Sequence, residues 1–392
     1  MTLDMSLFFL KGTGGHRLAD APGGKAYLTS DEATLRRGKR VFAESCARCH
    51  SSKIPSPAPG LDPGGCAGPG YLDCWNEYWR WTKTAEFKKK MTDAVMADDF
   101  LEGNYLSTDL RVPVTLLETN ACSPLATNAL RGDIWDNFSS QSYKDLPPVG
   151  KIKVHHPVTG KEWEYEMPGG GRGYTRPPSL ISVWSTAPFL LNNTVGRFDP
   201  SPSVEARTRS FQDSIEKLLW PEKREKDRIL GERVPGLIDR TTAMSEVRIA
   251  AGYVPDLLQP LLDPAGRVFP KLVDERGIRI GPIPEGTPVN LLANVSLLPP
   301  PGASPTERLK HDKDVLELLL RVKKDLISVP ANATSEQARA AFADLVDPLL
   351  RLNTCPDFVV NRGHYFGTSS FKEEPGLSDA DKRALIEFLK TL

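Results

Sequence analysis

The chain has 392 residues, which is enough for one large domain or two modest ones with a sizeable apolar core. Lys and Arg together number 50 and Asp and Glu also number 50, so the formal net charge is zero, and no block of like charges suggests a nucleic-acid-binding arm or a basic membrane surface. The 34 prolines and 31 glycines predict much irregular loop, and no apolar run reaches the ~20 residues that a membrane-spanning helix requires.

The first well-signalled element is a helix that begins near residue 30, after an N-terminal extension of residues 1–29. Ser30 is expected to be its N-cap, and Asp31 and Glu32 in the first turn suit the positive end of the helix dipole. The helix is predicted to end where two cysteines and a histidine follow one another closely.

The sequence Cys46-Ala47-Arg48-Cys49-His50 has the spacing Cys-x-x-Cys-His. Two thiols at this spacing add across the two vinyl groups of a haem, and the adjacent imidazole binds the iron, so the motif predicts one covalently attached haem c. A thioredoxin-like redox pair, half of a zinc site and a chance cluster are the alternatives. A redox pair sits at the strand-to-helix turn of a βαβ unit, and a zinc site needs a second closely spaced ligand pair; the sequence near the motif shows neither.

A covalent haem also predicts the compartment. Haem c is attached outside the bacterial cytoplasm or in an equivalent organelle compartment, so the protein is expected to be periplasmic or otherwise exported. Residues 1–25 lack the basic, apolar and small-residue regions of a secretory signal, so the sequence is expected to be the later part of a longer protein.

An oxidising compartment permits disulfides. Cys66 and Cys74 bracket a short Gly/Pro loop and are expected to pair with each other. Cys122 and Cys355 remain, and a bond between them would join the middle of the chain to its C-terminal part. Free, buried cysteines are the alternative, because sequence alone does not determine the connectivity.

The middle of the chain is predicted to contain short helices, irregular loops and a small amount of β structure. The expected elements are an aromatic-rich helix over 74–96, a hairpin over 151–167 that turns at Thr159-Gly160, a glycine-rich loop over 167–193, and amphipathic helices over 203–220, 306–327 and 335–353, the last capped by Ser335.

The last predicted helix lies within 377–392 and is capped by Ser378. One face of it carries four apolar residues: Leu385, Ile386, Leu389 and Leu392. In small c-type cytochromes an N-terminal and a C-terminal helix cross beside the haem edge, and the two terminal helices predicted here look like that pair.

The expected fold class is therefore mainly α. Residues 30–392 are expected to form a cytochrome c-like haem domain, whose haem core consists of 30–60 and 350–392. Residues 61–349 would be a long loop-rich insertion that contains the small β-hairpin.

His50 fills one axial position of the iron, and the ligand in the other position decides between electron transfer and reaction with oxygen species. His364 is the predicted second ligand because it lies in a loop shortly before the cap of the last helix, where Gly363 and Gly367 let the backbone bend. A loop histidine bonded to a backbone group is the alternative. The other candidates are His16, His155, His156, His311, Met91, Met96 and Met167.

Three phrases of the sequence resemble the di-haem cytochrome c peroxidase superfamily, and within it the rubber oxygenase branch: "VFAESCARCH", "RGYTRPPSLISVWSTAPFLLNN" and "NRGHYFGTSSFKEEPGLSDADKRALIEFLKTL". Members carry two c-type haems in two cytochrome-like halves. Only one Cys-x-x-Cys-His is present here, so the resemblance implies a C-terminal half with a single bis-histidine haem. Its partner would be a redox protein or a second haem domain.

The glycine-rich loop offers further candidates. Arg172 and Arg176 are expected to pair with haem propionates, because guanidinium matches carboxylate geometry. Tyr174 and Trp184 would pack against the porphyrin, with ordinary packing of the loop on the core as the alternative for all four residues. In many relatives a histidine follows Ala-Pro, whereas residues 189–191 here are Phe-Leu-Leu, which disfavours peroxidase chemistry at this loop.

Three functions follow from the sequence. The first is a c-type cytochrome that transfers electrons through an iron closed by two histidines. The second is a haem-dependent peroxidase or oxygenase with an open coordination position. The third is an interaction domain in which haem is only a structural core.

Overall fold

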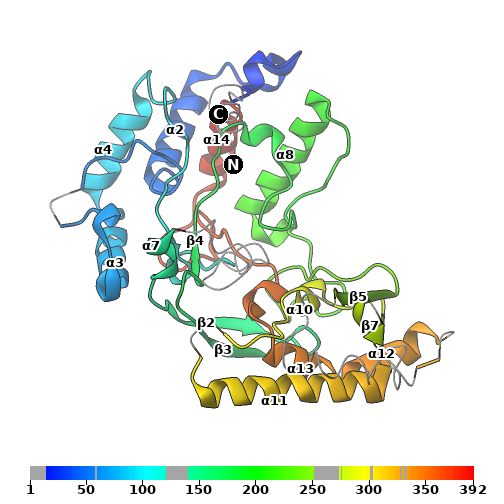
Figure 1. Ribbon diagram of the computed structural model, residues 1–392. Helices are drawn as coiled ribbons and strands as arrows, with labels where there is room; N and C mark the ends of the chain where they lie inside the picture. The colour runs from blue at the N-terminus through cyan, green and yellow to red at the C-terminus, as the bar shows by residue number, and fades with distance from the viewer. Residues whose placement is uncertain are drawn as a thin grey trace.

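The computed structural model describes residues 15–57, 60–120, 140–250, 273–274, 276–300, 303–326, 329–330 and 333–392. This part of the chain is mainly helical (Figure 1). Its α-helices are α2 (Glu32–Ser45), α3 (Tyr71–Trp81), α4 (Ala85–Met96), α5 (Val114–Leu117), α7 (Gln141–Lys144), α8 (Val204–Leu219), α10 (Val289–Ala293), α11 (Pro305–Arg321), α12 (Ser335–Ala343), α13 (Val346–Arg351) and α14 (Asp379–Leu389).

The strands form small antiparallel sheets. They are β1 (Val112–Pro113), β2 (Gly150–His155), β3 (Glu162–Met167), β4 (Tyr174–Thr175), β5 (Ser245–Ala250), β6 (Val273–Asp274) and β7 (Gly277–Ile283). β1 pairs with β4, β2 with β3, and β7 lies between β5 and β6. The β2–β3 pair confirms the predicted hairpin: Ile152 and Val154 point into the core, while Lys151 and Lys153, which alternate with them, are exposed.

Both terminal helices form where the sequence predicts them. The N-cap of α2 is Asp31 rather than Ser30, because the Asp31 carboxylate accepts hydrogen bonds from the backbone N–H groups of Ala33 and Thr34. Ser378 caps α14 as predicted.

Two predicted helices are each divided in two. The aromatic segment 74–96 contributes to α3 and α4, because the Thr84 hydroxyl accepts from the N–H of Phe87 and starts a new helix. The segment 335–353 forms α12 and α13. Its first cap is Thr334 rather than Ser335, because Thr334 and Gln337 form a reciprocal capping box.

Helices α2 and α14 lie against each other in the upper part of Figure 1. They cross at Gly38, where an added Cβ would come within 2.2 Å of the Ala384 carbonyl oxygen. The Phe42 and Phe388 rings meet edge to face with centroids 5.3 Å apart. Arg37 adds an ion pair to Asp381 at 2.7 Å. The terminal helices of the chain therefore pack directly on one another.

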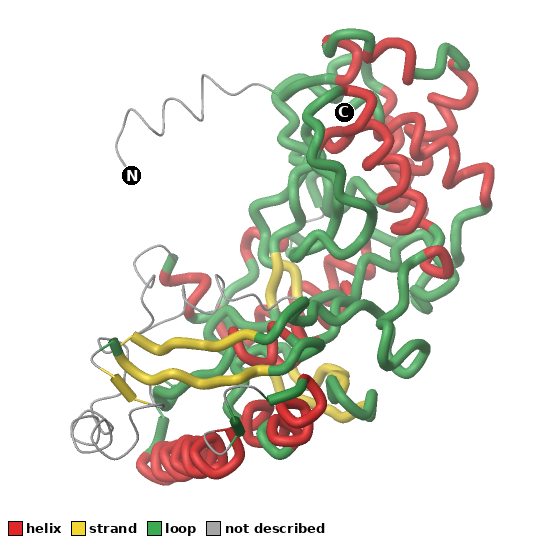
Figure 2. Tube along the Cα trace, turned by 90° about the vertical axis from the view of Figure 1, so that its right-hand side faces the viewer, coloured by secondary structure: helices red, strands yellow, loops and turns green. Residues whose placement is uncertain are grey.

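The buried apolar residues gather in two main clusters. The first unites α2, α3, α4, α8 and α14 with the β2–β3 hairpin. The second lies around β7, α10, α11, α12 and α13, in the lower part of Figure 1. Figure 2 shows the molecule from the side, with the hairpin strands running along the lower group of helices. Segments from the expected insertion thus contribute to both clusters.

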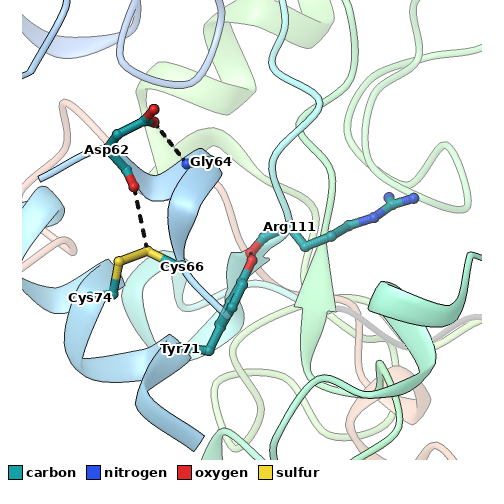
Figure 3. The surroundings of a disulfide bond; sticks show 6 residues. All are labelled: Asp62, Gly64, Cys66, Tyr71, Cys74 and Arg111. Carbon is teal, nitrogen blue, oxygen red and sulfur yellow. Dashed lines mark hydrogen bonds between the residues drawn. A yellow bond between two sulfur atoms is a disulfide. The ribbon is translucent and has the colours of Figure 1, made fainter. Parts of the chain in front are cut away.

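The predicted Cys66–Cys74 disulfide is present (Figure 3). It ties the loop that begins at Asp62 to helix α3. In the same region the Tyr71 hydroxyl donates to the Arg111 carbonyl at 2.8 Å, so α3 is also bound to the residue that directly precedes β1. Cys355 is disulfide-bonded, and Cys122, its expected partner, lies outside the described residues.

Membrane crossing requires both length and apolar composition in a helix. No helix in the described ranges combines the two.

Candidate functional site

A largely apolar cavity of about 480 Å³ lies where α2, α8 and α14 converge. This volume is in the range of about 300–1,000 Å³ typical of sites for small molecules and cofactors. Cys46, Cys49, His50 and His364 all line it. Apolar residues from α8, α14 and the 177–191 loop complete the wall, including Leu180, Val183, Phe189, Leu190, Ile215, Leu218, Leu219, Leu385 and Leu389.

The two motif cysteines follow α2 in a tight turn, in which the backbone N–H groups of Cys49 and His50 both donate to the Cys46 carbonyl. Both cysteines are unpaired. Burial raises the pKa of Cys46 to about 12 and that of Cys49 to about 11. A thioredoxin-like redox pair depends on a lowered thiol pKa, so this environment disfavours that alternative.

His50 is oriented by one hydrogen bond. Its Nδ1 lies 3.1 Å from the Pro178 carbonyl oxygen, and because a carbonyl only accepts, Nδ1 carries the proton. Burial lowers the pKa of His50 to about 4, which outweighs the opposite effect of that carbonyl. The ring is therefore neutral at neutral pH and has its lone pair on Nε2. Metal-ligating histidines typically have such a hydrogen bond at the other ring nitrogen.

The segment that carries Pro178 is itself fixed. The Ser107 hydroxyl donates to the Pro177 carbonyl at 2.5 Å, and the Ser179 hydroxyl donates to the Tyr105 carbonyl at 2.7 Å. The Pro178 carbonyl that orients His50 is thus held in place by hydrogen bonds between its own loop and the segment that contains Tyr105 and Ser107.

His364 has a left-handed backbone, with φ of 52°, between Gly363 and Gly367, which also have positive φ. For a residue other than glycine this conformation costs on the order of 1–3 kcal/mol, and such strain concentrates at functional sites. Burial, together with the neighbouring His50 and Arg224, lowers the pKa of His364 to about 3. Its Nδ1 is buried without a hydrogen-bond partner among the described residues.

The two imidazoles are spaced as ligands of one metal ion. Their ring centroids lie 6.4 Å apart, with 42° between the ring planes. If imidazole nitrogens bind iron at about 2.0–2.1 Å, as they bind zinc, two rings on opposite sides of one ion have centroids roughly 6 Å apart. Two neutral imidazoles at this spacing, beside two free thiols in an apolar cavity, fit a haem c.

The two predicted arginines differ in position. Arg176 lines the cavity and pairs with Asp109 at 3.3 Å, with 49% of its side chain exposed. Arg172 is not among the lining residues and lies instead near Tyr143 and Tyr165. The structure therefore does not bring Arg172 together with the other predicted site residues.

Tyr174 and Trp184 also stay outside the lining. The Tyr174 hydroxyl donates to the Pro147 carbonyl at 2.8 Å, and the Trp184 indole N–H donates to the His16 carbonyl at 2.6 Å. These contacts match the alternative prediction, in which the two aromatic residues pack the loop on the core.

The rival axial ligands are elsewhere. Within the described part of the chain, the cavity lining contains no methionine and no histidine other than His50 and His364. Met91 and Met167 are fully buried in the first apolar cluster. His155 lies beside Glu162, and His156 bonds to Asp347.

Sequence reasoning missed one residue inside the motif. Arg48 is 4% exposed and forms two hydrogen bonds with the Glu374 carboxylate, at 2.6 and 2.8 Å. Its guanidinium also lies over the Trp79 ring, 4.7 Å from the centroid. The pair fastens the cysteine turn to the segment before α14. No local pattern indicates it, because the two residues are 326 positions apart.

Comparison with known proteins adds no relative: no family model, curated protein or solved structure matches the chain. Over the described ranges, no three His, Cys, Asp or Glu side chains converge as the ligands of a bare metal ion would.

Proposed function

We propose that the protein is a c-type cytochrome that transfers electrons through a single haem with two histidine ligands. Cys46 and Cys49 would hold the haem covalently, and His50 and His364 would be the axial ligands. The observation that carries the proposal is the pair of neutral imidazoles, 6.4 Å apart, in a cavity that the two free cysteines of the motif also line.

The bound haem would supply one-electron oxidation and reduction at its iron. The chain's own part is to hold two nitrogen donors in place and to exclude water. The Pro178 carbonyl fixes the tautomer of His50, and the apolar wall from α8 and α14 keeps the local polarity low. Arg176, a half-exposed residue of the cavity lining, would pair with a propionate.

A haem-dependent peroxidase or oxygenase, of the di-haem peroxidase or rubber oxygenase type, needs an open axial position. The position of His364 across the cavity from His50 supports the closed arrangement instead. We further propose that the protein is exported to the periplasm or an equivalent compartment and exchanges electrons with a redox partner protein or a second haem domain.

The first test is production of the chain together with a c-type cytochrome maturation system. Mass analysis and the pyridine haemochrome spectrum should show one covalently bound haem, and paramagnetic resonance should show a low-spin ferric iron. Cys46→Ala combined with Cys49→Ala should abolish covalent attachment. A colourless protein that acquires no haem under these conditions would contradict the proposal.

The second test concerns the sixth ligand. His364→Ala should convert the iron to a high-spin form that binds carbon monoxide when reduced, whereas the wild type should not bind it. His155→Ala is the matched control, because His155 is a partly buried histidine outside the cavity lining. If the spectrum of His364→Ala equals that of the wild type, His364 is not a ligand. If the wild type itself binds carbon monoxide, the open-iron enzyme is the better assignment.

A further inference from the structure

Arg224 contacts the loop of His364 through the backbone. Its Nη1 donates to the Gly363 carbonyl at 2.9 Å and its Nη2 to the His364 carbonyl at 3.0 Å. The guanidinium also lies 4.8 Å from the centroid of the Tyr365 ring. One side chain therefore contacts three consecutive residues of the loop.

The same guanidinium binds the end of α8. Its Nε donates to the Lys217 carbonyl at 2.9 Å, and Nη2 also donates to the Leu218 carbonyl at 3.2 Å. These carbonyls belong to the last turn of the helix, where they lack intrahelical partners and where the helix dipole favours a cation. Leu218 lines the cavity, so Arg224 joins the cavity wall to the loop that carries the proposed ligand.

This connection matters because the His364 backbone is strained. A positive φ at a residue other than glycine persists only where its surroundings impose it. All the hydrogen bonds that the structure gives Arg224 go to backbone carbonyls, two on the helix and two on the loop. Without these hydrogen bonds, the loop is free to relax to an ordinary backbone conformation, which would turn the His364 imidazole away from His50.

We propose that Arg224 is the positioning residue that keeps His364 in place as the sixth ligand and so keeps the iron closed. The inference rests on the proposed function and adds to it the residue on which the closed state depends. The planar guanidinium suits the task because it presents several donors in a fixed fork, whereas lysine offers one compact charge.

The experiment compares Arg224→Gln and Arg224→Lys with the wild type as holo-proteins. Arg240→Gln is the matched control: Arg240 is also largely buried and also bonds to backbone carbonyls, those of Gly286 and Pro157, and it is not part of the cavity lining. The readouts are the high-spin fraction of the ferric protein, the affinity of the ferrous protein for carbon monoxide, and the unfolding midpoint.

We expect Arg224→Gln to show a high-spin fraction and to bind carbon monoxide at concentrations at which the wild type does not, because apparent affinity rises with the fraction of open protein. Arg224→Lys should fall between the two. Arg240→Gln should lower the unfolding midpoint and leave the iron low-spin and closed, which separates positioning from a general loss of stability.

A folded Arg224→Gln protein that stays low-spin and does not bind carbon monoxide would overturn the inference. If that variant does not accumulate with haem, Arg224→Lys decides: carbon monoxide binding supports the inference, and wild-type behaviour overturns it. Failure of the proposed function looks different, because the wild type itself would then lack haem, or His364→Ala would have the wild-type spectrum.

Discussion

The hydrogen bond from His50 Nδ1 to the Pro178 carbonyl spans 128 positions of the sequence. It leaves the lone pair on Nε2 free of that bond, and the ring lines the cavity, where the His364 ring lies 6.4 Å away. Individual contacts of this kind, between residues far apart in the chain, determine which atoms of the motif are available for chemistry.

A second long-range contact gives a prediction about stability. Glu374→Gln removes the counter-charge of Arg48, whose side chain is only 2% exposed. We expect the free energy of unfolding of the holo-protein to fall by about 3–5 kcal/mol, because a buried cation is left unpaired. Denaturant unfolding followed by circular dichroism measures it. Glu86→Gln, which breaks an exposed ion pair with Lys90, should change the value by less than about 1 kcal/mol; equal effects would contradict the prediction.

The Asp227–Arg240 pair predicts a pH dependence. Burial would raise the pKa of Asp227, but hydrogen bonds from the Arg240 guanidinium and the Leu230 N–H hold it below the ordinary value. A lowered pKa in the folded state means that the carboxylate stabilises the fold fully above its unfolded pKa of about 3.9, and that this stabilisation is lost as the pH falls through the folded-state value.

Asp227→Asn is the variant that tests this. The difference in unfolding free energy between wild type and variant should be constant from pH 7 to about pH 5 and shrink as the pH is lowered further, below about 3.9. Urea unfolding at a series of pH values measures the difference. A difference that stays constant down to acid pH would show that the Asp227 charge does not stabilise the fold.

At the scale of elements, helices α2 and α14 illustrate what local sequence predicts well. In each helix the cap and the apolar face lie within a few residues of one another in the sequence, so both helices form near the expected bounds. The division of 74–96 into α3 and α4 was not predicted, because the Thr84 cap inside a helical pattern looks like an ordinary polar position. The division of 335–353 was not predicted because α13 follows Leu345, which makes no side-chain cap hydrogen bond, so no capping residue marks its start.

The crossing of these two helices depends on a residue without a side chain. Gly38→Ala would place a methyl group against the Ala384 carbonyl and the Phe388 side chain. We expect a loss of about 1–3 kcal/mol in unfolding free energy, as in other overpacked interfaces. Gly65→Ala is the control, since an added Cβ there meets no atom within 4 Å among those described. Thermal unfolding gives the midpoints of the two variants. Equal midpoints would show that the contact between α2 and α14 accommodates the added methyl group without loss of stability.

At the scale of the molecule, the cavity belongs to the first apolar cluster, and the cluster around β7 and α11 to α13 has a core of its own. Leu318 is fully buried in the second cluster, whereas Leu385 is buried in the first and lines the cavity. The same substitution at the two positions should therefore have different consequences.

Leu318→Ala and Leu385→Ala should each lower the unfolding free energy by about 2–5 kcal/mol, because each removes buried methyl groups. Only Leu385→Ala should also shift the reduction potential, since it lets water approach the proposed haem. Denaturant unfolding and potentiometric titration measure the two effects. A shift in potential of similar size for Leu318→Ala would show that the second cluster is coupled to the site.

Sequence by itself determined the features that depend on neighbours in the chain: the Cys-x-x-Cys-His spacing, the hairpin at Thr159-Gly160 and the two terminal helices. It also favoured the Cys66–Cys74 pair, which the structure contains. Capping, alternation and short loop closure all act within about ten residues, so their patterns are visible without a fold.

Only the tertiary structure decided which distant groups meet. It placed His364 rather than a methionine opposite His50, brought Arg176 but not Arg172 to the cavity, and joined Arg224 to the His364 loop. Such contacts connect segments more than a hundred residues apart, and they arise from how buried surfaces pack, which no local pattern of residues encodes.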